Sequence, residues 1–109
     1  MYKRQVQDLL VRSVGNITAS IALCTQASAL QDRGDHRDEF SALAKAFATA
    51  RMRETVGWCR EVLGGNGIVL GAGVARSFAD AEAIYSYEGT REMNTLIVGR
   101  AITGHAAFV

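Results

Sequence analysis

The positions of the chain-breaking residues constrain the fold of this chain more strongly than any other feature. The sequence contains no proline, and five of its 11 glycines lie between residues 64 and 73. Proline and glycine are the residues that most often interrupt helices. The sequence therefore predicts long helices before residue 64, a loop at residues 64–73 and shorter helices after it.

Apolar residues recur every three or four positions in four segments, as they do along one face of a helix. The predicted helices span residues 5–32, 36–63, 74–85 and 90–107. We expect Gly34 to cap the end of the first helix, and Asp35 and Thr90 to be N-caps of the second and fourth. The apolar stripe of the first helix comprises Val6, Leu9, Leu10, Val14, Ile17, Ile21, Cys24, Ala27 and Leu30. The fold class predicted is all-α, an up-and-down four-helix bundle-like domain with two long antiparallel helices.

The second predicted helix is rich in alanine, with Leu43 and Phe47 on its apolar face. Small side chains permit the close approach of another helix. Two helices of this length are long for a chain of 109 residues. Their wide apolar faces need further partners, so we expect a homo-oligomer, either a dimer or a tetramer.

Charge and cysteine content exclude several kinds of site. The chain has 12 Lys and Arg against 11 Asp and Glu, and these charges are scattered, which argues against nucleic acid as a partner. No run of about 18 apolar residues could span a membrane. Neither the cysteines, Cys24 and Cys59, nor the histidines, His36 and His105, have metal-ligand spacing. We therefore expect no metal site, and two buried free thiols in a reducing intracellular compartment such as the cytoplasm.

Two segments carry candidate chemistry, and each has a purely structural alternative. The glycines of residues 64–67 allow backbone N–H groups to approach an anion, or they form a plain loop between helices, which their spacing favours. Glu88 follows an apolar run and precedes a helix start. Removal from water would make its carboxylate a stronger proton acceptor, suited to general-base catalysis. The alternative is a solvated acid that interacts with the helix dipole.

The second half of the chain contains three motifs at a fixed spacing. They are Glu61-Val62-Leu63-Gly64-Gly65-Asn66-Gly67-Ile68, Val74-Ala75-Arg76 and Tyr87-Glu88-Gly89-Thr90. Together they resemble the C-terminal helical domain of acyl-CoA dehydrogenases. The tail from Leu96 to Gly104, with Phe108, looks most similar to the glutaryl-CoA dehydrogenase branch, and the acid at Glu61 fits that branch as well. The resemblance covers essentially the whole chain.

The resemblance implies a role for individual residues. Glu88 matches the base that removes the α-proton of an acyl-CoA thioester, while the β-hydrogen leaves as hydride to FAD. The backbone N–H of Glu88 would polarise the thioester carbonyl, and Gly89 matches a position that contacts substrate. Residues 61–65 match a segment that reaches the FAD of a neighbouring subunit. The complete set of implied FAD contacts is Glu61, Val62, Leu63, Gly64, Gly65, Thr90, Glu92 and Phe108.

The resemblance also concerns the size of the functional unit. Family members carry an N-terminal helical domain and a middle β-domain ahead of this one. We therefore expect residues 1–109 to be the C-terminal domain of a longer enzyme and to be inactive alone. An electron-transferring flavoprotein is the implied electron acceptor. The alternative hypothesis is a non-catalytic helical oligomerisation module that has kept the family motifs.

Overall fold

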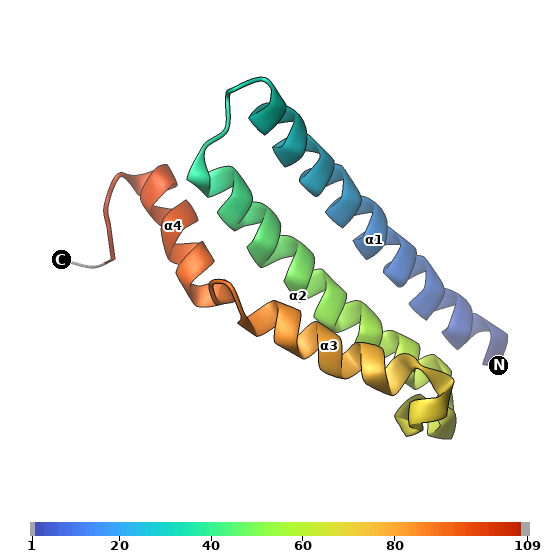
Figure 1. Ribbon diagram of the computed structural model, residues 1–109. Coiled ribbons are helices and arrows are strands. Elements are labelled where there is room, and N and C mark those ends of the chain that lie inside the picture. The colour runs from blue at the N-terminus through green and yellow to red at the C-terminus, as the bar shows by residue number, and fades with distance from the viewer. Residues whose placement is uncertain (1, 108–109) are drawn as a thin grey trace.

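The computed structural model describes residues 2–107, with side chains from residue 4, and this part of the chain contains helices and no strand. The elements are α1 (Tyr2–Asp32), α2 (Asp38–Val62), two 3-10 turns, η1 (Gly64–Ile68) and η2 (Leu70–Ala72), then α3 (Val74–Ser86) and α4 (Arg91–Thr103). Figure 1 shows α1 and α2 as an antiparallel pair, with α3 and α4 following one another along α2. The predicted all-α fold with four helices is confirmed.

Helix α2 is the centre of the molecule. It packs against α1, α3 and α4, and these are the extensive helix contacts of the described residues. The principal dimensions are 49 × 27 × 23 Å, so the helices form an elongated layer (Figure 1). The buried apolar residues are all small: Ala42 and Ala44 on α2 and Ala81 on α3. The alanines of α2 therefore allow the close helix approach that the sequence predicts.

The connection between α1 and α2 comprises residues 33–37, two residues more than the predicted 33–35. Gly34 adopts a left-handed conformation with φ of +79°, and it ends α1 as expected. The N–H groups of Gly34 and Asp35 donate to the carbonyls of Gln31 and Leu30 at 3.0 and 2.9 Å, which is the Schellman pattern. Because Asp35 belongs to this motif, it is not the N-cap of α2. Arg37 takes that position, without a side-chain cap, and α2 begins at Asp38.

The outer face of α1 differs from the prediction. Its apolar stripe was expected to face the core, yet Leu10, Val14, Ile17 and Ile21 are between 50% and 61% exposed. The cause is the layer arrangement, in which α1 packs extensively only against α2. The same arrangement leaves the Cys24 thiol exposed, where burial was expected, and Cys59 is half-buried.

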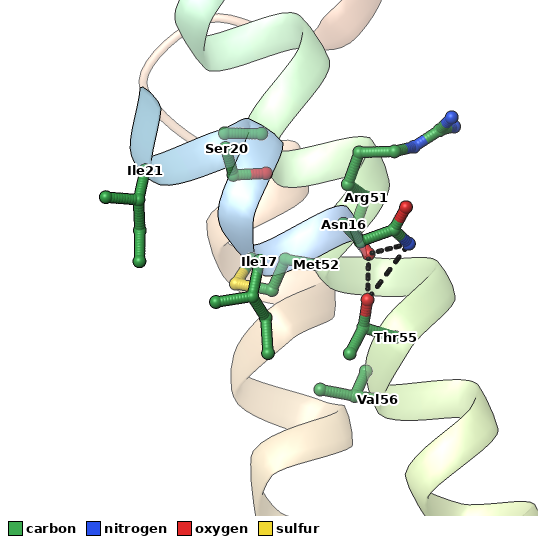
Figure 2. A pocket seen from close by; sticks show the side chains of 9 residues that line it. Asn16, Ile17, Ser20, Ile21, Arg51, Met52, Thr55 and Val56 are labelled. Carbon is green, nitrogen blue, oxygen red and sulfur yellow. Dashed lines mark hydrogen bonds between the residues drawn. The ribbon is translucent and has the colours of Figure 1, made fainter. Parts of the chain in front are cut away.

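Polar side chains line the contact between α1 and α2. Asn16 of α1 donates through Nδ2 to Thr55 Oγ1 at 3.1 Å and to the carbonyl of Arg51 at 3.4 Å (Figure 2). Ile17 and Met52 help to line a groove of about 290 Å³ beside these hydrogen bonds. Asn16 can reach these two acceptors, which lie one turn apart on α2, in only one alignment of the helices. These bonds therefore define how the two long helices are placed along each other.

In the second half of the chain, most helix boundaries lie close to their predicted positions. The α-helical geometry of α2 ends at Val62, and the glycine-rich segment forms the two 3-10 turns. Thr90 is the N-cap of α4 as predicted, because its Oγ1 accepts from the Met93 N–H at 3.2 Å. The predicted end of α4 at residue 107 is wrong. Gly104 has φ of +76° and terminates the helix, and its N–H donates to the Arg100 carbonyl at 2.8 Å.

Candidate active site

The loop between α3 and α4 contains Tyr87, Glu88, Gly89 and Thr90. Glu88 has φ of +54°, and it is the only non-glycine residue with positive φ in the described part of the chain. The left-handed region is unfavourable for residues with a Cβ, so such a conformation persists only where the surroundings hold it. Gly89 follows with φ of +94°. The backbone at the candidate base is therefore strained and fixed in an unusual geometry.

Two side chains from neighbouring helices hold this loop. Lys45 of α2 donates through Nζ to the carbonyl oxygens of Tyr87 and Gly89 at 2.7 and 2.8 Å. Asn94 of α4 is buried and donates through Nδ2 to the carbonyls of Gly89 and Thr90 at 3.0 and 3.1 Å. A Cβ on Gly89 would lie 3.4 Å from this Asn94 nitrogen. The backbone on both sides of Glu88 is thus anchored by hydrogen bonds.

The functional groups of Glu88 are accessible. Its side chain is exposed and forms no ion pair with residues 4–107. Over the same range, the backbone N–H groups of Glu88 and Gly89 donate to no backbone carbonyl. The apolar surroundings that the sequence predicts for Glu88 are not supplied by residues 4–107. An exposed loop therefore carries a carboxylate next to two N–H groups that have no backbone acceptor within residues 4–107.

The glycine-rich segment lies at the other end of α3. Glu61 and Leu63 to Gly65 are exposed, and Val62 is half-buried. A Cβ at Gly64 or Gly65 would meet nothing within 4 Å, so this backbone is open to close approach. The 13 residues of α3 make it about 20 Å long. The fold consequently does not bring residues 61–65 and the Glu88 loop into one site within a single chain.

The first turn of α4 contains the two remaining described candidates, Thr90 and Glu92. Thr90 accepts the capping hydrogen bond, which leaves its hydroxyl proton able to donate elsewhere. A hydrogen bond from its own backbone N–H lowers the pKa of Glu92, and the neighbouring Arg91 guanidinium contributes in the same direction. Phe108 lies outside the described residues.

Other kinds of site have little basis in the described residues. No three His, Cys, Asp or Glu side chains among them lie close enough together to hold a metal ion. None of the described helices is both long and apolar enough to cross a membrane. The groove beside Asn16 is lined almost entirely by apolar and uncharged side chains and has no acid within it. The Glu88 loop is therefore the strongest candidate for chemistry.

Sequence reasoning missed Lys45 and Asn94, which hold the Glu88 loop. Lys45 is separated from Tyr87 by 42 positions, so no local motif connects them. One signal was available, because Lys45 is the only charged residue within the alanine-rich stretch 42–50. A charge retained in such an apolar stretch indicates a specific acceptor nearby.

Comparison with known proteins identifies the family. The sequence model described as "Acyl-CoA dehydrogenase, C-terminal domain" matches residues 2–103. The chain belongs to the acyl-CoA dehydrogenase family. The fold agrees with this assignment, since the crystal structure of a glutaryl-CoA dehydrogenase from Mycobacterium smegmatis in complex with FADH2 superimposes with a TM-score of 0.89. That structure is 31% identical, and the match covers 94% of this chain and 27% of the M. smegmatis chain.

Two acyl-CoA dehydrogenases of Geobacter metallireducens are similar in sequence. Cyclohexane-1-carbonyl-CoA dehydrogenase is 28% identical over 104 residues, which are 95% of this chain and 27% of that protein. Cyclohex-1-ene-1-carbonyl-CoA dehydrogenase is 30% identical over 98 residues, 89% of this chain and 26% of that protein. This acyl-CoA dehydrogenase domain therefore spans about a quarter of the length of the relatives that it matches.

Proposed function

We propose that this chain is the C-terminal domain of an FAD-dependent, glutaryl-CoA dehydrogenase-like enzyme, in which Glu88 is the general base. The observation that carries the proposal is the Glu88 loop. A carboxylate without an ion pair within residues 4–107 stands at the surface on a strained, anchored backbone. Positioned carboxylates of this kind are suited to proton abstraction.

The loop offers two complementary interactions to a thioester. The Glu88 carboxylate accepts the α-proton of the acyl group. The backbone N–H of Glu88 has no backbone acceptor within residues 4–107, so it can donate to the thioester carbonyl, where negative charge develops during proton removal. Gly89, with φ of +94° and no side chain, lets the acyl chain approach the backbone. Water exclusion would come from the rest of the enzyme, because Glu88 is exposed in this domain.

The chain's own residues fit a role in holding FAD. Gly64 and Gly65 leave open space for close approach, and the Thr90 hydroxyl retains a proton to donate. FAD, when bound, supplies the acceptor for the β-hydrogen as hydride. Residues 61–65 and Thr90 lie at opposite ends of α3, so in the proposed assembly they contact the flavins of two different subunits. The glutaryl-CoA dehydrogenase match in complex with FADH2 supports the same cofactor.

The functional test uses a hybrid enzyme in which this chain replaces the matching part of the M. smegmatis glutaryl-CoA dehydrogenase. We expect the hybrid to bind FAD and oxidise an acyl-CoA with an artificial electron acceptor. Glu88→Gln should lower kcat by about 10²–10⁴-fold and leave the flavin content unchanged, because general-base catalysis contributes about that factor.

The matched control is Glu82→Gln, which makes the same chemical change at an exposed ion pair of α3. It should retain turnover. If Glu88→Gln retained turnover as well, or if a hybrid with a full complement of flavin were inactive before any substitution, the proposed role of Glu88 would be wrong.

A further inference from the structure

We propose that Lys45 is a positioning residue for Glu88, whose ammonium fixes the backbone that presents the carboxylate to substrate. The proposal deepens the function proposed above and rests on Glu88 acting as the base. It assigns to α2, the central helix, a direct part in shaping the reactive loop. No motif around Glu88 contains this residue.

The geometry of the Lys45 ammonium is specific to Glu88. Its two acceptors are the carbonyl oxygens of Tyr87 and Gly89, at 2.7 and 2.8 Å. These are the residues immediately before and after Glu88. An ammonium has three donors, and hydrogen bonds from a charged donor are shorter and stronger than neutral ones. One cation therefore bridges the peptide groups on either side of the base.

The conformation of Glu88 needs such support. Its φ of +54° is unfavourable for a residue with a Cβ. Asn94 also contacts the loop, through the carbonyls of Gly89 and Thr90. Because Asn94 lies on α4, directly after the loop, its bonds alone would let the loop and the first turn of α4 move together. Lys45 supplies the link to α2 that prevents this movement.

The ammonium acts through the backbone and not by pairing with the base. Lys45 and Glu88 form no ion pair, although both side chains are described. A direct ion pair would stabilise the carboxylate and weaken it as a proton acceptor. Binding to the neighbouring carbonyls fixes the position of Glu88 and leaves its carboxylate free for substrate. The role is thus one of positioning.

The first experiment measures the loop in the full chain by NMR. A residue with positive φ gives a strong intraresidue cross-relaxation peak between its amide and α protons, and we expect one for Glu88. Lys45→Met keeps the aliphatic stem and removes the donors. It should weaken this peak and shift the carbonyl carbon resonances of Tyr87 and Gly89. Arg53→Met is the matched control, because it neutralises another cation of α2 that bridges to α3 at 2.7 Å.

Arg53→Met should leave the Glu88 peak and both carbonyl resonances in place. Unchanged signals in Lys45→Met would overturn the proposal. If Lys45→Met loses its helical circular dichroism and so fails to fold, the proposal is tested in the unaltered chain instead. There the Lys45 ammonium protons should exchange with water about tenfold more slowly than those of free lysine. Exchange at the rate of free lysine would overturn the proposal equally.

The second experiment separates this proposal from the role of Glu88 itself. In the hybrid enzyme, Lys45→Met should lower kcat by about 10²-fold, the effect of a misplaced catalytic group. Flavin content and KM should stay within about threefold of the unaltered hybrid, and Lys45→Arg, which keeps charge and donors, should recover part of kcat. A merely structural residue would instead lose flavin and stability together.

Glu88→Gln is measured in parallel and identifies which statement has failed. If Glu88→Gln abolishes turnover while Lys45→Met retains it, the positioning role of Lys45 is wrong and the base assignment stands. If Glu88→Gln itself retains turnover, the base assignment is wrong, and the NMR measurement still decides whether Lys45 holds the loop.

Discussion

Gly67 determines whether the glycine-rich segment can pack against the end of α2. It is the only buried glycine of the 3-10 turn η1, and a Cβ there would lie 2.2 Å from the Arg60 carbonyl oxygen. Real Cβ atoms do not approach backbone oxygen so closely, so η1 can fold back on the end of α2 only with glycine at this position. The turn in turn sets where α3 begins.

Gly67→Ala should therefore destabilise the chain. Forcing a methyl group into a packed contact costs about 1–3 kcal/mol, measured as a lower urea midpoint. Gly65→Ala is the control, because a Cβ at Gly65 meets nothing within 4 Å. That substitution should change stability by less than about 0.5 kcal/mol. Equal midpoints for the two variants would show that η1 does not need the close approach at Gly67.

Single residues also show most clearly what could be predicted from the sequence and what could not. Glu88 could be identified from its motif, since Tyr87 to Thr90 are contiguous. The partners that hold the loop could not, because Lys45 comes from a helix 42 positions earlier. The positive φ of Glu88 was equally hidden, as glutamate has no local preference for it. A local motif can therefore indicate a candidate reactive group, whereas the contacts that hold it depend on the tertiary fold.

At the scale of the element, the start of α4 combines a cap and a charge. Thr90 caps the helix, and Glu92 lies in the first turn, where the exposed N–H groups attract a carboxylate. Hydrogen bonding to its own backbone N–H lowers the pKa of Glu92 from its usual value of 4.5. A lowered pKa in the folded state means that the ionised carboxylate stabilises the fold.

This stabilisation has a defined pH dependence. It is fully present above the unfolded-state pKa, near 4.5, and is lost as the pH falls through the lower folded-state pKa. Glu92→Gln should therefore lower the Tm at pH 7, with a difference that shrinks below pH 4.5 and vanishes once the native carboxylate is protonated. Thermal unfolding across this pH range measures it. A Tm difference that persists at the acidic end would indicate lost packing and not lost charge.

The helices themselves were predictable, and their ends less so. Apolar periodicity identified all four helices, of which α1, α3 and α4 each pack against α2. Asp35 was a reasonable N-cap by residue type, but the Schellman motif at Gly34 uses its N–H, and α2 starts three residues later, at Asp38. Periodicity also extended α4 beyond Gly104, which ends the helix. The spacing of apolar residues shows which face of a helix is apolar. Only the tertiary structure shows which element covers that face.

At the scale of the whole molecule, the exposed side of α1 carries a row of apolar side chains that the other described helices do not cover. Leu10, Val14, Ile17 and Ile21 lie about one or two turns apart and are all at least half exposed. The 31 residues of α1 make it about 46 Å long, enough for an interface of standard size. An apolar face of this length in water favours association. It also supports the oligomer that the sequence predicts.

We expect the chain to form a homo-oligomer through this face. Val14→Lys combined with Ile21→Lys places two charges on it, one every two turns, and burying them in an interface would be costly. The double variant should have the mass of one chain in sedimentation velocity, with its helical circular dichroism unchanged. Thr18→Lys with Thr25→Lys adds the same charges with the same spacing at exposed polar positions of α1, and it should retain the oligomer. If the unaltered chain were already monomeric, the predicted self-association through the apolar face of α1 would be wrong.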